Sequence, residues 1–201
     1  MSGTSGSGKT TLCRNLESVL QNNCIYLSFD DYFAHSKINL LNWYTHGANP
    51  DEIENQKLHE DLHSLRIGRK IKHILTGVEL EPTKYILLDE PFGKSRYRKN
   101  KLIDLSIHLR TPLEISLARR ILRQLSNPNE SLEKQNHSIR NYLNTYLNSH
   151  IRNLYTAVDS LALNECDISL DGSKSADELV SEVLNLLSWK NGGDLNSNSS
   201  Y

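Results

Sequence analysis

The chain has 201 residues, of which 37% are hydrophobic and 23% charged, and its formal net charge at pH 7 is −1. This length favours one α/β domain over two, and the near-neutral charge gives no electrostatic footprint for nucleic acid or an anionic membrane. The 3 cysteines are widely spaced, which excludes a disulfide framework or a zinc cluster and favours a reducing compartment. No apolar stretch approaches the roughly 20 residues of a membrane span. We therefore expect a cytoplasmic protein that binds neither nucleic acid nor membranes.

Helical and strand-like patterns alternate along the chain. In chain order, they predict a helix over 10–20, a strand over 24–29, a helix over 53–65, strands over 85–88 and 105–109, a helix over 112–125, a helical region over 131–162, interrupted or not, a strand over 166–170 and a helix over 176–187. Such alternation predicts a parallel sheet with helices on both faces. We expect this α/β domain to cover residues 1–190, with a disordered tail rich in Asn, Gly and Ser over 191–201.

The start of the chain reads Gly-Thr-Ser-Gly-Ser-Gly-Lys-Thr over residues 3–10, the phosphate-binding loop pattern G-x-x-x-x-G-K-[ST]. Glycines let successive backbone N–H groups turn around a phosphate, the lysine reaches the β- and γ-phosphate oxygens, and the threonine hydroxyl binds Mg²⁺. The loop leads into a helix whose N-terminus favours an anion. The predicted nucleotide-binding residues here are Gly3, Thr4, Ser5, Gly6, Ser7, Gly8, Lys9, Thr10 and Thr11.

Acidic pairs follow two of the predicted strands. Asp30 and Asp31 end the first, and Asp89 and Glu90 end the second. Carboxyl ends of parallel strands meet at one edge of a sheet, so both pairs should lie near the phosphate loop. We expect Asp89 or Glu90 to hold Mg²⁺, directly or through water, unless the pair merely ends its strand. Asp30 is favoured over Asp31 as the residue that accepts a proton from a substrate hydroxyl; the alternative role is a turn or helix cap.

Three arginines lie on the predicted helix after the third strand. Arg119 and Arg123 share one face because they are four residues apart, and Arg120 is adjacent. Cationic side chains on such an element neutralise a γ-phosphate as it transfers. We expect Arg119 and Arg123 to act in catalysis and Arg120 in nucleotide binding; the alternative is a solvated helix face.

These motifs, in this order, resemble the uridine kinase branch of the P-loop kinases, which includes nicotinamide riboside kinases and bacterial-type pantothenate kinases. The matching pieces are residues 3–11, 28–33, 49–54, 88–90 and 117–123, and the ending 170–179 resembles the turn near the adenine in related kinases. The resemblance implies an ATP- and Mg²⁺-dependent small-molecule kinase with a P-loop fold. By similarity, Asp30 is the base for a ribose 5′-hydroxyl, Tyr32, Phe33 and Trp43 line the acceptor pocket, and Gly172 lies near the nucleotide.

The sequence also departs from that family. Uridine kinases typically carry Asp-x-Phe-Tyr, whereas Tyr32 precedes Phe33 here, and residues 69–79 lack a Pro-x-Tyr-Asp run that shapes the uridine pocket. The leading prediction is therefore γ-phosphate transfer from ATP to a nucleoside-like hydroxyl. The alternatives are an inactive or regulatory nucleotide-binding protein and a kinase for a non-nucleoside metabolite such as pantothenate. Homo-oligomerisation stays open.

Only Met1 and Ser2 precede the loop, where a P-loop fold has a central strand. We therefore expect a sheet that lacks its first central strand, with two explanations: the protein starts upstream, or it is a degenerate relative. Two other patterns are weaker. His59, Glu60 and His63 form the H-E-x-x-H arrangement of zinc proteases, more simply a surface helix, and the basic run over 94–101 is more simply a phosphate-site loop than a nucleic-acid contact.

Overall fold

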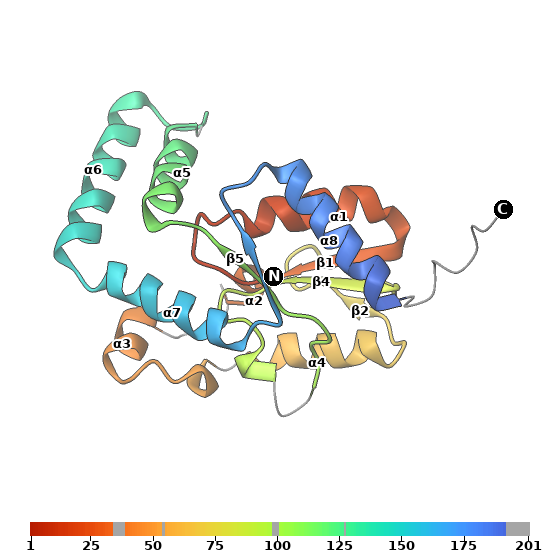
Figure 1. The fold of residues 1–201 in the computed structure, drawn as a ribbon. Coiled ribbons are helices and arrows are strands. Elements are labelled where there is room, and N and C mark those ends of the chain that lie inside the picture. The colour runs from red at the N-terminus through yellow and green to blue at the C-terminus, as the bar shows by residue number, and fades with distance from the viewer. Residues whose placement is uncertain (34–38, 54, 98–100, 127, 192–201) are drawn as a thin grey trace.

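Two parallel strand pairs form the centre of the molecule (Figure 1). In the computed structural model, which describes residues 1–33, 39–53, 55–97, 101–126 and 128–191, β1 (Cys24–Ser28) pairs with β4 (Tyr85–Asp89). The second pair consists of β5 (Ile107–Arg110) and β6 (Ile168–Asp171). All four strands belong to elements predicted from the sequence, although β5 begins at residue 107 rather than 105. The expected parallel α/β architecture is confirmed.

Met1 and Ser2 lie between the two pairs and connect them. The Ser2 N–H donates to the Ile107 carbonyl at 2.8 Å, and the Ser2 carbonyl accepts from the Leu109 N–H at 2.8 Å. On the other side, the Met1 carbonyl accepts from the Glu90 N–H at 2.9 Å. The resulting order is β1, β4, the first two residues, β5 and β6. In the described part of the chain, these two residues occupy the position predicted for a central strand.

Helices cover both faces of the strands (Figure 1). One face carries α1 (Lys9–Leu20) and α8 (Ala176–Asn191), which contact each other. The other carries α4 (Gln56–Arg66) and α7 (Ile151–Glu165). No helix among the described residues has the length and apolar character needed to cross a membrane.

The apolar strands supply both layers of the core because side chains alternate along a strand. Tyr26 packs into the cluster of α1 and α8, where Leu16 and Val183 are almost fully buried. Ile25 and Leu27 point the other way, into the cluster of α4 and α7. Side chains of the continuous apolar run over 24–27 thus pack alternately against the two helix layers.

Two helices extend beside this sandwich (Figure 1). They are α5 (Leu113–Leu125) and α6 (Leu132–Asn148), and α6 is followed by α7 after a break. The break occurs at Ser149, whose extended backbone (φ −123°, ψ 178°) ends α6. The helical region predicted over 131–162 is therefore interrupted.

Several short elements were not predicted. They are α2 (Phe29–Phe33), α3 (Leu40–Thr45), the antiparallel strands β2 (Ile71–Lys72) and β3 (Glu79–Leu80), and single 3₁₀ turns over 21–23, 50–52 and 95–97. Elements of two to six residues are too short to show a hydrophobic period. The helix predicted from residue 53 begins at Gln56, because the Asn55 side chain caps it by accepting from the Leu58 N–H at 3.3 Å. The predicted tail lies outside the described residues except for Asn191, which ends α8.

Candidate active site

The phosphate loop connects Ser2 to the N-terminus of α1 in a conformation that requires glycine. Gly6 has φ +84°, and a Cβ at this position would lie 2.4 Å from the Ser116 carbonyl oxygen. Gly8, the N-cap of α1, has φ +106° and makes no side-chain cap. The first N–H groups of α1 are therefore left to an anion, as in other helix N-termini that bind phosphate.

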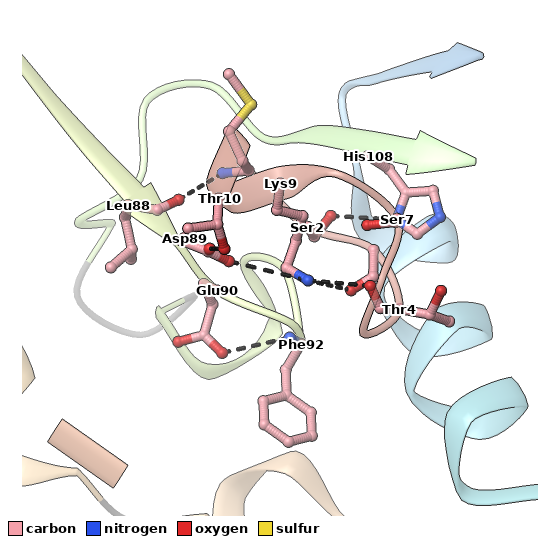
Figure 2. A network of polar contacts seen from close by, with 12 residues as sticks. Ser2, Thr4, Ser7, Lys9, Thr10, Leu88, Asp89, Glu90, Phe92 and His108 are labelled. Carbon is pink, nitrogen blue, oxygen red and sulfur yellow. Dashed lines mark hydrogen bonds and ion pairs between the residues drawn. The ribbon is translucent and has the colours of Figure 1, made fainter. Parts of the chain in front are cut away.

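Lys9 and Thr10 connect the loop to the end of β4 (Figure 2). The Thr10 hydroxyl donates to Asp89 Oδ2 at 2.6 Å, and Lys9 Nζ lies 3.9 Å from Asp89 Oδ1. Lys9 Nζ also donates to the carbonyls of Gly3 (2.9 Å) and Thr4 (3.1 Å). The predicted meeting of the loop with the acidic end of a strand is present in the structure.

The residues present fit a bound phosphate and a divalent cation. Ser7 Oγ is buried, and among the described residues it has no hydrogen-bond partner, so the loop contains an unused polar group. The hydroxyl of Thr10 and the carboxylate of Asp89 are oxygen ligands of the kind that Mg²⁺ prefers. Thr11 is exposed on the first turn of α1, and Ser5 is half-buried in the loop.

Asp89 and Glu90 point in different directions although they are neighbours (Figure 2). Glu90 Oε2 accepts from Arg96 at 3.0 Å and from the Tyr97 hydroxyl at 2.5 Å, and Glu90 Oε1 accepts from the Phe92 N–H at 3.3 Å. Burial raises the pKa of Glu90, and these partners oppose that shift. Of the two carboxylates proposed for the metal, the structure brings only Asp89 to Thr10, while Glu90 belongs to a buried network behind the site.

Asp30 and Asp31 begin α2 directly after β1. Partial desolvation raises the pKa of Asp30, the neighbouring Asp89 carboxylate adds to the rise, and the positive charge of Lys9 opposes it. Asp30 is exposed at the start of α2, close enough to Lys9 and Asp89 for their charges to act on its carboxylate. Asp31 instead lies 3.5 Å from His73 Nε2. The two aspartates therefore have separate surroundings.

Arg119 reaches the phosphate loop from α5. One of its guanidinium nitrogens donates to the carbonyls of Ser7 (3.1 Å) and Gly172 (3.0 Å). A Cβ on Gly172 would lie 1.9 Å from Thr111 Oγ1, so this turn approaches the loop closely only with glycine. Arg123, one turn further along α5, is exposed, and its charge lowers the pKa of Asp30. Arg119, Arg123 and Gly172 thus all lie around the site.

The predicted role of Arg120 in nucleotide binding does not agree with its position. Its guanidinium is buried over three aromatic rings, with Cζ 4.3 Å from the ring centre of Tyr155, 5.5 Å from Tyr146 and 5.7 Å from Tyr142. Only its aliphatic stem approaches the loop, where it limits the space at Gly6. Neighbouring positions on a helix point about 100° apart, so Arg119 and Arg120 cannot both face the phosphates. Arg120 joins α5 to α6 and α7 instead.

The residues predicted to line an acceptor pocket are largely packed into the core. Tyr32 is buried and donates from its hydroxyl to Asp61 Oδ2 at 2.9 Å. Phe33 is half-buried, with its ring stacked 5.2 Å from that of Phe29. Trp43 is buried, and its indole N–H donates to the Asn49 carbonyl at 2.6 Å. Tyr32 and Trp43 belong to one core cluster with Phe33 packed against it, and the Tyr32 hydroxyl already has a partner.

The other two sequence patterns are accommodated within the fold. His59 stacks on Tyr97 at 4.7 Å between ring centres, and Glu60 accepts from Gln56 at 2.7 Å. Within the described ranges, no group of three or more His, Cys, Asp and Glu side chains is placed to hold a metal ion. In the basic run, Lys94 pairs with Asp167 and Arg96 with Glu90, while residues 98–100 lie outside the described residues.

Three polar residues at the site were missed by sequence reasoning. Thr111 Oγ1 donates to the Ser7 carbonyl at 3.1 Å, and the Ser116 hydroxyl lies 3.4 Å from Thr4 Oγ1. Asp61 is almost fully buried on α4 and accepts from Tyr32 and Lys57. Thr111 follows a strand directly, and Asp61 interrupts the apolar face of its helix, so both positions carried a signal in the sequence.

Comparison with known proteins decides the family. A family model described as an AAA domain matches residues 1–141. A uridine kinase of Borrelia garinii subsp. bavariensis is 31% identical over 162 residues, covering 72% of this chain and 74% of the relative. The chain belongs to the uridine kinase family. A uridine kinase of Borreliella burgdorferi is 30% identical over 163 residues with the same coverage, and one of Staphylococcus haemolyticus is 24% identical over 163 residues.

A solved structure has the same fold. It is a putative fructose transport system kinase from Silicibacter sp. TM1040, with 18% sequence identity and a TM-score of 0.56 over 84% of this chain and 86% of that chain. As a member of the uridine kinase family, the chain is a P-loop small-molecule kinase, a phosphotransferase with a hydroxyl group as acceptor. The nucleotide-binding fold and the enzyme class expected from the sequence are confirmed.

Proposed function

We propose that this protein transfers the γ-phosphate of ATP to a hydroxyl of a nucleoside-like acceptor, with uridine as the first candidate. The observation that carries the proposal is the position of Asp30 directly after β1, close enough to the Lys9–Asp89 pair for both charges to act on its carboxylate. A proton acceptor beside a phosphate loop is what transfer to a hydroxyl needs. The curated relatives at 31% and 30% identity bear the name uridine kinase, which supports this acceptor class.

The phosphates would be held by the backbone N–H groups at the start of α1 and by Lys9. In the structure the Lys9 ammonium donates hydrogen bonds to the carbonyls of Gly3 and Thr4, and these bonds hold the ammonium within the loop. Thr10 and Asp89 would hold Mg²⁺, which when bound neutralises phosphate charge. Arg119 is in place to add positive charge because it already bonds the Ser7 carbonyl. Arg123 acts from the same helix face.

On the acceptor side, Asp30 would orient the hydroxyl and take its proton as the phosphoryl group arrives. A carboxylate with a raised pKa is a better proton acceptor than an ordinary aspartate, provided that it stays ionised at the working pH. Of the three predicted acceptor residues, Phe33 is partly exposed and would offer an aromatic face to a planar base, while the buried Tyr32 and Trp43 belong to the core cluster against which it packs. Because the Tyr32 hydroxyl is bonded to Asp61, we expect base discrimination to rest on shape rather than on that hydroxyl.

The test is a comparison of acceptors at fixed ATP and Mg²⁺. Initial rates of ADP formation are measured with uridine, cytidine, nicotinamide riboside and pantothenate, and Lys9→Met serves as the control for contaminating kinases. We expect kcat/KM to be highest for a pyrimidine nucleoside. Turnover of pantothenate alone would contradict the nucleoside assignment. Tight ATP binding without transfer to any acceptor would contradict the catalytic assignment and favour a regulatory nucleotide-binding protein.

A further inference from the structure

A serine, a histidine and an aspartate meet beside the start of the phosphate loop. Ser2 Oγ lies 3.2 Å from His108 Nδ1 (Figure 2), and His108 Nε2 lies 3.3 Å from Asp159 Oδ1. The side chains come from the residue before the loop, from β5 and from α7. We call these three residues the polar trio. None of them belongs to the site described above, so their contacts need a separate explanation.

The polar trio is closed to solvent at its centre, which excludes a hydrolase-like reaction at Ser2. Ser2 is 1% exposed and His108 is 0% exposed, so a substrate cannot reach either side chain. In serine hydrolases the serine is bonded to Nε2 and the aspartate to Nδ1, the reverse of the order here. The polar trio therefore acts through the positions of its members and not through a reaction.

Asp159 determines which nitrogen of the His108 ring carries a proton. An ionised carboxylate only accepts hydrogen bonds, so the proton that faces Asp159 Oδ1 belongs to Nε2. In the described part of the chain, neither of these two atoms has a hydrogen-bond partner elsewhere, and the Nε2 proton satisfies both. Nδ1 of the neutral ring is then the acceptor for the Ser2 hydroxyl.

The polar trio lies in an otherwise apolar layer. Ser2 and His108 form a parallel β-bridge, so their side chains project side by side from one face of the sheet. This face is covered by α7, whose buried residues are Leu154, Val158 and Ala162. Buried polar groups must be desolvated, and an apolar ring of the same size would avoid that cost. The polar trio therefore contributes orientation more than stability.

The orientation that it fixes is that of the phosphate loop. Ser2 directly precedes Gly3, whose carbonyl accepts from Lys9 Nζ at 2.9 Å. The backbone bonds of Ser2 to β5 lie within the sheet, whereas its side-chain bond to His108 lies on the face of the sheet. The side-chain bond thus restrains Ser2 in a direction that the backbone bonds leave open. A displacement of Ser2 would reach the Lys9 ammonium through a single carbonyl group.

We propose that His108 is a positioning residue of the nucleotide site. Held by Asp159 of α7, its ring accepts the Ser2 hydroxyl and thereby fixes the Gly3 carbonyl that binds Lys9. The inference rests on the proposed ATP site. It adds a contact between α7 and the loop to the contact that Arg119 makes from α5.

Three substitutions of His108 separate the two contacts of its ring. Asparagine carries its amide near the place of Nδ1 and can bond Ser2 alone, whereas glutamine carries it near the place of Nε2 and can bond Asp159 alone. Phenylalanine can bond neither. ATP affinity is titrated calorimetrically in the presence of Mg²⁺, and urea unfolding measures the stability of each variant. Ser2→Ala removes the same bond without changing the ring.

We expect His108→Phe and His108→Gln to weaken ATP binding about fivefold, the effect of one lost neutral hydrogen bond. His108→Asn should stay within about twofold of the original affinity, although its smaller side chain leaves a cavity and lowers the urea midpoint. His108→Phe should be the most stable of the three because it fills the apolar layer. Ser2→Ala should match His108→Phe in ATP affinity, and the double variant should lose no more.

Equal ATP affinities of the three His108 variants would overturn the proposal, and so would affinities that follow the urea midpoints. Additive losses for Ser2→Ala and His108→Phe would show that the two residues do not act through one bond. The titrations need no acceptor, so the expected pattern of ATP binding without phosphoryl transfer would count against the proposed function alone. An unmodified chain that does not bind ATP would overturn both assignments.

Discussion

Asp89 and Glu90 are neighbours in sequence but belong to two different regions. Asp89 faces the phosphate loop, where it accepts from Thr10 and approaches Lys9. Glu90 faces the interior, where Arg96 and Tyr97 bind it. Both carboxylates are buried, and what differs is whether their partners belong to a ligand site or to the core. At the end of β4, Asp89 therefore belongs to the proposed phosphate and metal site, whereas Glu90 stabilises the fold.

The largest effect is expected from Asp89→Asn. Replacing the carboxylate removes the charge opposite Lys9 and a ligand of the proposed Mg²⁺ site, so kcat/KM should fall about 10³-fold, or about 4 kcal/mol. Thermal unfolding should change little, because the amide retains an oxygen that accepts from Thr10. A loss of stability comparable to the loss of activity would show that Asp89 and Glu90 do not differ in role. Steady-state kinetics and calorimetry on one preparation give both values.

Glu90→Gln should show the opposite pattern. It leaves the buried Arg96 guanidinium without a counter-charge, which costs about 3 kcal/mol of unfolding free energy. For a chain of this size the melting temperature should fall by about 6–12 °C, at about 2–4 °C per kcal/mol. At temperatures where the variant is folded, ATP affinity should remain within about twofold, since Glu90 does not contact the loop. Urea unfolding and ATP titration measure the two quantities, and a large loss of ATP affinity would place Glu90 in the site.

A smaller effect is expected from Arg120→Ala. The variant loses the stacking of a buried guanidinium on Tyr155 and its two neighbours, which we put at about 2 kcal/mol. Arg140→Ala is the matched control, because Arg140 is exposed on α6 and should change stability by less than about 0.5 kcal/mol. Equal urea midpoints for the two variants would contradict the structural role of Arg120.

The smallest effect concerns the pH dependence. The positive charge of Arg123 lowers the pKa of Asp30, so Arg123→Ala should raise it further. A base must be deprotonated to act, and activity is therefore lost as the pH falls through its pKa. The acidic limb of the kcat profile should shift to higher pH in the variant. A shift of this limb to lower pH, or an unchanged limb, would show that the charge of Arg123 does not lower the pKa of Asp30.

The sequence predicted the parts of this fold that depend on local pattern. The phosphate loop and the apolar runs over 24–27 and 85–88 were recognised because their spacing reflects geometry within a single element. The direction of the Glu90 side chain was not predictable, because it depends on hydrogen bonds from Arg96 and Tyr97, which lie in the 3₁₀ turn over 95–97. Arg120 was misassigned because helical spacing does not reveal which tyrosines of α6 and α7 will surround a guanidinium.

The residues predicted to line the acceptor pocket also depend on contacts that the sequence does not reveal. The resemblance assigned Tyr32 to the acceptor pocket, but the partner of its hydroxyl, Asp61, comes from α4, 29 residues later. Pairings across that distance are set by how the helix layers pack on the sheet. A short motif therefore identifies the phosphate side of the site better than the acceptor side.

The central claim, that Asp30 is the proton acceptor for phosphoryl transfer, is tested most directly by comparing Asp30→Asn with Asp31→Asn. Transfer from ATP to uridine is followed by ³¹P NMR, and ATP affinity is titrated separately. We predict that Asp30→Asn lowers kcat about 10³-fold with ATP affinity unchanged, whereas Asp31→Asn, next to His73, retains kcat within about tenfold. Undiminished phosphate transfer by Asp30→Asn would contradict this account.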